Sequence, residues 1–182
     1  MKSRMIPLIV FAVVFLAAPL RMALSAQQDR FSIKALDGIS FSEFQGYDAW
    51  QTVAVSRTAN DIKAILGNPA MIAAYKSGIP GNGQPFPDGV QIVKIEWKQA
   101  PNPLSPYAVE IPNTLDAVAF IEKDSKRFPD SSGWGYAQFN FDPASGNFSA
   151  YGTDANFGTK VCYQCHTRVK DSDYIFTKFQ PR

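Results

Sequence analysis

The sequence is poor in the residues that bind metals and form disulfides. Its 182 residues include two cysteines, one histidine and four methionines. A structural zinc site usually takes four Cys or His ligands, commonly as two separated pairs, and the chain has no second pair. Coordination of one metal ion by two histidines of the same chain is also excluded. Both cysteines and the histidine lie in one segment, so a metal site built from these residues must lie there.

The chain also lacks a strong charge of either sign. It has 18 Lys and Arg residues and 16 Asp and Glu residues. Lys2, Arg4 and Arg21 lie in the first 26 residues, which contain no acidic residue, so 15 basic residues face 16 acidic ones in the remainder. Domains that bind nucleic acid usually carry clustered positive charge. We therefore expect no nucleic-acid partner.

The segment 1–26 has the features of a secretory signal peptide. Basic residues precede an apolar run from Met5 to Leu20, and small residues follow up to Ala26. The run is shorter than the roughly 20 residues that span a bilayer, and Pro7 and Pro19 interrupt it. We expect the segment to be removed, which predicts a periplasmic protein without a stable membrane span and one domain over residues 27–182.

Both cysteines and the histidine lie in one segment, Cys162-Tyr163-Gln164-Cys165-His166. C-x-x-C-H is the attachment pattern of c-type haem. Residues three apart share a helix face, so both thiols can form thioethers to haem while the imidazole is carried beneath the iron. A disulfide or redox-active dithiol is the alternative, but no βαβ pattern precedes the segment. The motif predicts covalent haem c, with His166 as iron ligand.

Few residues remain to occupy the other side of the iron. Three of the four methionines lie in the predicted signal peptide, which leaves Met71. Met71 stands in an apolar helical context that favours a core role. We therefore expect an iron that is pentacoordinate, or that carries water or a lysine. Such an iron binds or transforms small molecules rather than only passing electrons.

Alternation of apolar and polar residues predicts short strands. The ranges are Phe31–Leu36, Trp50–Ser56, Asp61–Leu66, Gln91–Lys98 and Trp134–Phe141. Thr114–Asp124 suits either a helix or a strand. In Trp50–Ser56 we place Val53 and Val55 on one face, and in Gln91–Lys98 the alternation sets Lys94 opposite Val93 and Ile95.

Helix and loop signals complete the predicted fold. Asn68 is an N-cap followed by a proline, so a helix should begin at Pro69 and stop at Gly78. The segments 78–89 and 142–159 are rich in turn-forming residues and should be loops. We predict an α+β fold: a mostly antiparallel sheet of about five strands with one or two short helices, forming a single haem domain.

Several further motifs occur in a fixed order along the chain. They are Tyr47-Asp48-Ala49-Trp50, Phe86-Pro87-Asp88-Gly89 followed by Lys94, the run from Lys123 to Asp130 followed by Gly133-Trp134, and the haem motif followed by Asp173-Tyr174-Ile175-Phe176-Thr177. As an ordered set they resemble the cytochrome P-460 and cytochrome c′-beta family. The resemblance implies an antiparallel β fold, a homodimer, and a haem c with one axial histidine and an open distal side.

The family resemblance suggests two kinds of chemistry. Cytochromes P-460 oxidise hydroxylamine and carry a bond from a lysine to the haem edge, and Lys94 stands where that lysine is expected. The c′-beta members lack the bond and bind nitric oxide or carbon monoxide. An ordinary solvated strand lysine is the alternative interpretation of Lys94. Hydroxylamine oxidation also uses a carboxylate as proton acceptor, for which Asp171 and Asp173 are candidates, although one of them could instead orient the C-terminal segment.

Aromatic residues provide the remaining candidates for the pocket. Phe86 is similar to a distal phenylalanine of the c′-beta type, and Trp97, Trp134 and Tyr136 are candidate haem contacts, although strand aromatics are commonly core residues. The family resemblance thus implies a hydroxylamine-oxidising haem oxidoreductase that delivers electrons to another cytochrome. A binding protein for nitric oxide or carbon monoxide is the alternative, and a simple electron carrier is less favoured.

Overall fold

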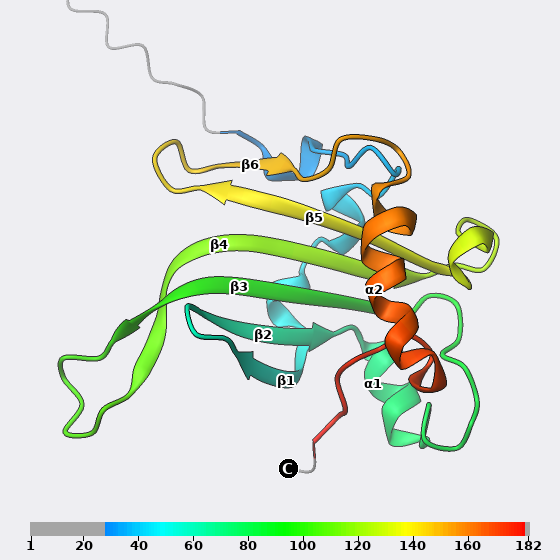
Figure 1. Cartoon of the computed structure of the whole chain (residues 1–182), viewed down its shortest axis with the longest axis horizontal. Coiled ribbons are helices and arrows are strands. Elements are labelled where there is room, and N and C mark those ends of the chain that lie inside the picture. Colours follow the sequence, from blue (N-terminus) through cyan, green and yellow to red (C-terminus); the bar gives the residue numbers. More distant parts are fainter. Residues whose placement is uncertain (1–27, 181–182) are drawn as a thin grey trace, which may run out of the picture.

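The computed structural model describes residues 28–180, which are organised around one antiparallel sheet (Figure 1). Its six strands are β1 (Gln51–Arg57), β2 (Asp61–Gly67), β3 (Gln91–Pro101), β4 (Glu110–Lys123), β5 (Trp134–Asp142) and β6 (Asn147–Ala150). Each strand pairs with the next one along the chain. The sheet is therefore a meander, and the predicted fold class is confirmed. The predicted signal peptide lies outside the described residues.

The helices are short. They are α1 (Pro69–Lys76), the 3-10 helices Arg30–Ser32, Phe41–Phe44, Tyr47–Ala49 and Pro129–Ser131, and a C-terminal series made of Gly158–Tyr163, α2 (Gln164–His166) and Thr167–Ser172. We call this series, residues 158–172, the C-terminal helical segment. Figure 1 shows it lying across the strands on one face of the sheet. In the described part of the chain, no helix combines the length and apolar character needed to cross a membrane.

Helix α1 begins and ends close to the predicted positions. The Asn68 side chain accepts a hydrogen bond from the Met71 main-chain nitrogen at 2.9 Å, and Pro69 occupies the first turn. The Asn68 side-chain amide also donates to the Gly89 carbonyl at 2.9 Å. One residue thus caps α1 and ties it to the loop before β3, which confirms the predicted helix.

Two segments differ from the prediction. Phe31–Leu36 is not a strand, because Asp29 caps a 3-10 helix over Arg30–Ser32 and only an isolated bridge between Lys34 and Ser40 follows. The predicted loop 142–159 contains β6, whose polar residues gave no strand signal. The ambiguous Thr114–Asp124 falls largely within β4.

The shared face predicted for Val53 and Val55 is also wrong. Val53 is 1% exposed and Val55 is 69% exposed. The register between β1 and β2 shifts between Thr52 and Ala54, so Val53 occupies a β-bulge. A bulge inserts one residue into the alternation and thereby moves the following side chains to the other face.

The two faces of the sheet have different roles. On one face, Phe41, Phe44 and Tyr47 from the N-terminal 3-10 helices pack on residues of the central strands, including Val93 and Phe120. The Phe44 and Phe120 rings are stacked with centroids 4.1 Å apart. This face forms the larger aromatic core. The opposite face is covered by α1 and the C-terminal helical segment, and it carries the candidate site.

Candidate functional site

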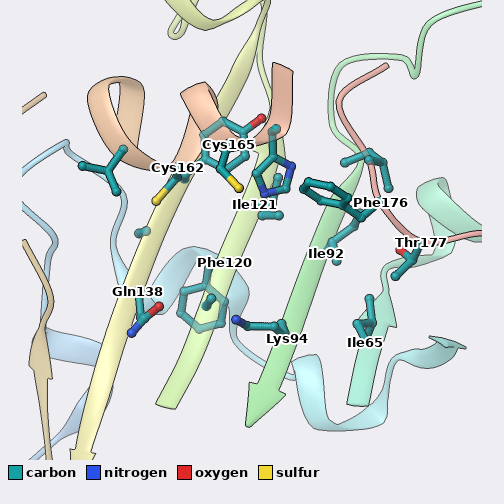
Figure 2. Close-up of a pocket in the computed structure, with 16 residues that line it drawn as sticks. Ile65, Ile92, Lys94, Phe120, Ile121, Gln138, Cys162, Cys165, Phe176 and Thr177 are labelled. Atoms are coloured by element: carbon teal, nitrogen blue, oxygen red, sulfur yellow. The ribbon is translucent and has the colours of Figure 1, made fainter. Parts of the chain in front are cut away.

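A cavity of about 370 Å³ lies between the sheet and the C-terminal helical segment (Figure 2). Its lining is largely apolar and consists of Ile65, Ile92, Lys94, Ala119, Phe120, Ile121, Tyr136, Ala137, Gln138, Val161, Cys162, Cys165, His166, Ile175, Phe176 and Thr177. Figure 2 shows the sulfur atoms of Cys162 and Cys165 directed from the helix toward the sheet, where Lys94 extends from β3. The cavity thus gathers the predicted haem motif and the predicted cross-linking lysine.

The C-terminal helical segment approaches β5 closely because Gly158 has no side chain. A Cβ atom on Gly158 would lie 2.7 Å from the Tyr136 carbonyl oxygen and 2.9 Å from Asp37 Oδ2. The following helical turns then present Cys162 and Cys165 on the cavity side. The two thiols are free rather than joined by a disulfide. Burial raises the pKa of the Cys162 thiol to about 11.

The His166 ring is held in a neutral form with one nitrogen available. Its Nδ1 lies 2.6 Å from the main-chain oxygen of Tyr174. A carbonyl only accepts hydrogen bonds, so Nδ1 carries the proton and Nε2 keeps its lone pair. Burial lowers the pKa of His166 and favours the neutral ring. The ring lies between those of Tyr136 and Phe176, with centroids 4.7 and 4.8 Å away.

These features fit a haem c group. Two thiols three residues apart, a neutral imidazole with a free Nε2, and an apolar cavity beside them meet the requirements of the C-x-x-C-H motif. The hydrogen bond from Nδ1 to a carbonyl is the usual support of a metal-binding histidine. Cys162, Cys165 and His166 are the residues that would hold the group.

Lys94 lines the cavity. The Val93 side chain is fully buried in the aromatic core on the other face, as the strand alternation predicts. The Lys94 amine lies 2.9 Å from Glu96 Oε2, and the Lys63 amine lies 3.0 Å from Glu96 Oε1. The Lys94 side chain is 33% exposed, so it is not a freely solvated surface lysine.

Glu96 is a carboxylate held between two amines. Burial would raise the pKa of Glu96, but hydrogen bonds from Lys94 and Lys63 outweigh that effect and hold the pKa below its ordinary value. Glu96 was not singled out from the sequence, because the carboxylates considered there, Asp171 and Asp173, were those just after the haem motif. The available signal was strand alternation, which places Glu96 on the same face as Lys94.

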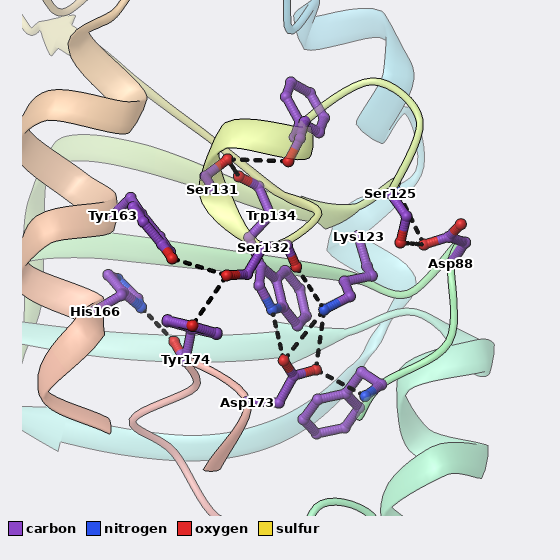
Figure 3. Close-up of polar contacts among 12 residues, drawn as sticks. Asp88, Lys123, Ser125, Ser131, Ser132, Trp134, Tyr163, His166, Asp173 and Tyr174 are labelled. Carbon is purple, nitrogen blue, oxygen red and sulfur yellow. Dashed lines mark hydrogen bonds and ion pairs between the residues drawn. The ribbon is translucent and has the colours of Figure 1, made fainter. Parts of the chain in front are cut away.

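The structure places Asp171 and Asp173 away from the cavity lining. Asp171 is exposed. The Asp173 carboxylate accepts hydrogen bonds from the Lys123 amine, the Trp134 indole and the Phe86 main-chain nitrogen (Figure 3). These contacts correspond to the alternative interpretation, in which one of the two aspartates orients the C-terminal segment.

Three of the predicted aromatic pocket residues, Phe86, Trp97 and Trp134, do not line the cavity either. Phe86 is 2% exposed and packs against Tyr75 and Trp134, with ring centroids 5.2 and 6.0 Å away. Trp97 pairs with Leu115 in the sheet outside the cavity lining. Phe86 and Trp134 are therefore core residues beside the site.

Other residues of the same strands do line the cavity. Tyr136 does so, as the sequence indicates, and Gln138 lies two residues further along β5. Strand alternation in β5 places Gln138 on the same face as Tyr136, so the sequence could have predicted that it lines the cavity. Phe176 and Thr177 also line the cavity, but only the tertiary fold brings them there.

Met71 is not available as a second iron ligand. It lies on the buried face of α1, is completely buried in the core, and is not among the residues that line the cavity. Among the cavity-lining residues in the described part of the chain, His166 is the only histidine and none is a methionine. Besides His166, Lys94 is therefore the described cavity residue with a nitrogen that could bind the iron.

The sheet and the cavity thus define a haem protein of α+β fold. The family profile described as Cytochrome P460 matches residues 44–177. The chain therefore belongs to the Cytochrome P460 family, whose members bind haem c, and the resemblance noted in the sequence is confirmed. A comparison with curated protein sequences gives no match.

Proposed function

We propose that the protein is a periplasmic mono-haem c-type cytochrome that oxidises hydroxylamine to nitrogen oxides. In this proposal Cys162 and Cys165 form the thioethers and His166 is the single axial ligand. The observation that carries it is the position of Lys94, which lines the same cavity as these three residues. Haem c, when bound, supplies a redox-active iron with an open coordination position.

The cavity position of Lys94 supports the proposed bond to the haem edge. In that bond a C–N bond would replace one ring C–H and one amine N–H bond, and a two-electron oxidant of the peroxide class would take up the electrons. Strand β3 directs Lys94 into the cavity, and Glu96 holds its amine at 2.9 Å. An amine attached to an aromatic ring carbon is a weak base and is uncharged near neutral pH. The bonded lysine would therefore stop acting as a cation beside Glu96.

Glu96 is the proposed proton acceptor. With Lys94 uncharged, one cation, Lys63, would remain in contact with the carboxylate. Loss of a neighbouring cation raises a carboxyl pKa, and an acceptor works best when its pKa lies near the working pH. Bonding of Lys94 would thus turn an ion-paired glutamate into a better base beside a cavity-lining residue.

Binding of nitric oxide or carbon monoxide is the second candidate. The observation that favours it is the apolar lining, which includes Ile65, Ile92 and Ile121 and has no carboxylate among its described residues. A simple electron carrier is less favoured because Met71 lies in the core.

Hydroxylamine oxidation also needs an electron-accepting cytochrome. We propose a homodimer as the functional form, as the family resemblance implies.

The test compares wild type with Lys94→Ala, and uses Lys63→Ala as the matched control that removes the other partner of Glu96. We expect the wild-type tryptic haem peptide to include the Lys94 peptide. Lys94→Ala should show an ordinary c-type ferrous spectrum and lose hydroxylamine oxidation, while Lys63→Ala should keep the cross-linked mass. A wild-type haem attached only through Cys162 and Cys165 would overturn the cross-link and favour gas binding.

A further inference from the structure

The Asp173 carboxylate is largely shielded from solvent and accepts hydrogen bonds through both oxygens (Figure 3). The Lys123 amine lies 3.1 and 3.2 Å from its two oxygens, the Trp134 indole nitrogen 3.3 Å from Oδ1, and the Phe86 main-chain nitrogen 2.8 Å from Oδ2. The Lys123 and Asp173 side chains are 7% and 11% exposed. Lys123 also donates to the Ser132 carbonyl at 2.9 Å. This network joins β4, β5 and the loop before β3 to one point of the C-terminal segment.

The backbone at that point has an unfavourable conformation. Asp173 and Tyr174 have φ values of +45° and +65°, and neither is a glycine. Consecutive left-handed residues with side chains are rare, because the Cβ atom crowds the following carbonyl. Such a turn persists only where surrounding contacts hold it. The contacts of the Asp173 carboxylate, made to three other parts of the chain, provide that hold.

The strained turn determines where the Tyr174 carbonyl points. That carbonyl oxygen lies 2.6 Å from His166 Nδ1. The residues that follow the turn, Ile175, Phe176 and Thr177, line the cavity. The Lys123–Asp173 ion pair is therefore connected to His166, the predicted iron ligand, through one residue of main chain, Tyr174.

We propose that Asp173, paired with Lys123, is a positioning residue that sets the hydrogen bond of His166 and thereby the reduction potential of the iron. A strong hydrogen bond from Nδ1–H raises the basicity of the imidazole, and a more basic axial ligand favours ferric over ferrous iron. A looser turn would lengthen the hydrogen bond from His166 Nδ1 to the Tyr174 carbonyl and would therefore make the imidazole less basic. The proposal rests on His166 as haem ligand, which is part of the proposed function, but not on the substrate.

The experiment uses the full haem-loaded protein and the variant Asp173→Asn. The double variant Asp173→Asn/Lys123→Met removes both charges, so that no unpaired buried charge prevents folding. Glu122→Gln is the matched control, since Glu122 is a buried carboxylate whose side chain is ion-paired with Arg127 and accepts a hydrogen bond from Gln91, rather than from residues of the turn. Readouts are the midpoint potential and the iron–histidine stretching band of the ferrous protein by resonance Raman.

We expect both Asp173 variants to raise the midpoint potential by about 59 mV, a tenfold change in the ferrous-to-ferric ratio for one electron. The iron–histidine band should move to lower frequency, and Glu122→Gln should leave both readouts at wild-type values. If Asp173→Asn fails to fold, the double variant decides the outcome. A folded, haem-loaded Asp173 variant with unchanged potential and band overturns the proposal. Both readouts are taken without hydroxylamine, so failure of the oxidation leaves them unaffected.

Discussion

The amine of Lys94 lies 2.9 Å from Glu96 Oε2, two residues further along the same strand. The two side chains therefore share the sheet face that carries the cavity. A bond between Lys94 and haem would change the charge beside Glu96, so the proposed cross-link would affect the proposed proton acceptor. As long as Lys94 is a free amine, Glu96 is held between two cations and its pKa stays below the ordinary value. A lysine bonded through its amine would release the carboxylate.

Glu96→Gln should remove hydroxylamine oxidation while leaving haem attachment intact. An amide keeps the shape of the side chain but cannot accept the proton, and general-base catalysis contributes about 10²–10⁴-fold. We expect a loss of about 100-fold or more in kcat, together with loss of the acidic limb of the pH–rate profile. Turnover assays across pH give the measurement.

The control for this variant is Asp61→Asn. Asp61 carries a carboxylate within 4.8 Å of Glu96, but it pairs with Lys98 rather than with Lys94. The control should therefore keep wild-type turnover. Equal losses in both variants would mean that the local charge, and not a proton acceptor, matters. An unchanged rate in Glu96→Gln would remove Glu96 from the mechanism.

Covalent attachment should depend on both cysteines. The wild-type haem should stay with the protein after acid-acetone extraction, because thioethers survive it and an axial bond does not. Cys162→Ala and Cys165→Ala should each retain less haem, and the double variant should lose the thioether attachment. Mass spectrometry of the extracted chain provides the measurement. Complete loss of colour from the wild type would show that no covalent bond exists.

The parts of the fold that the sequence predicts are those fixed by local chemistry. Asn68 caps α1 through its own side chain, and the alternation in Gln91–Lys98 places Lys94 on the face opposite Val93. The errors come from non-local effects. The bulge at Val53 depends on pairing with β2, and β6 forms because β5 offers its edge to a polar segment.

The candidate site also has residues that the local sequence identifies and residues whose role depends on distant parts of the chain. Cys162, Cys165 and His166 are adjacent in sequence, so their spacing is sufficient to recognise them. The role of Asp173 follows from partners far away in the chain, Phe86, Lys123 and Trp134, and no local pattern shows it. Phe86 lies in a loop, as the sequence predicts, but the fold buries it against Trp134 instead of placing it in the cavity lining.

Met71 should matter for stability but not for the iron. Met71→Ala removes a fully buried side chain, which typically costs about 2–5 kcal/mol in the free energy of unfolding. Met71→Leu conserves volume and should cost less than about 1.5 kcal/mol. In both variants the ferrous spectrum and the affinity for carbon monoxide should match the wild type. A low-spin ferrous spectrum that disappears only in these variants would instead identify a His/Met electron carrier.

Gly158→Ala should impair haem incorporation, although Gly158 does not line the cavity. The added methyl group would lie 2.7 Å from the Tyr136 carbonyl and 2.9 Å from the Asp37 carboxylate, so the helical segment must move away from β5. Overpacking of this kind costs about 1–3 kcal/mol. The movement also carries Cys162 and Cys165 away from the sheet that forms the other wall. We expect a lower midpoint of thermal unfolding and a smaller haem-to-protein ratio.

Gly81→Ala is the matched control for this variant. A Cβ atom on Gly81 would meet only the Gly78 carbonyl, at 3.3 Å, in a loop that does not line the cavity. Its haem-to-protein ratio should equal that of the wild type. If Gly158→Ala also kept full haem loading and thermal stability, the close approach to β5 would not be what positions the haem motif. If both variants lost haem equally, the loss would reflect general sensitivity of the fold to added side chains.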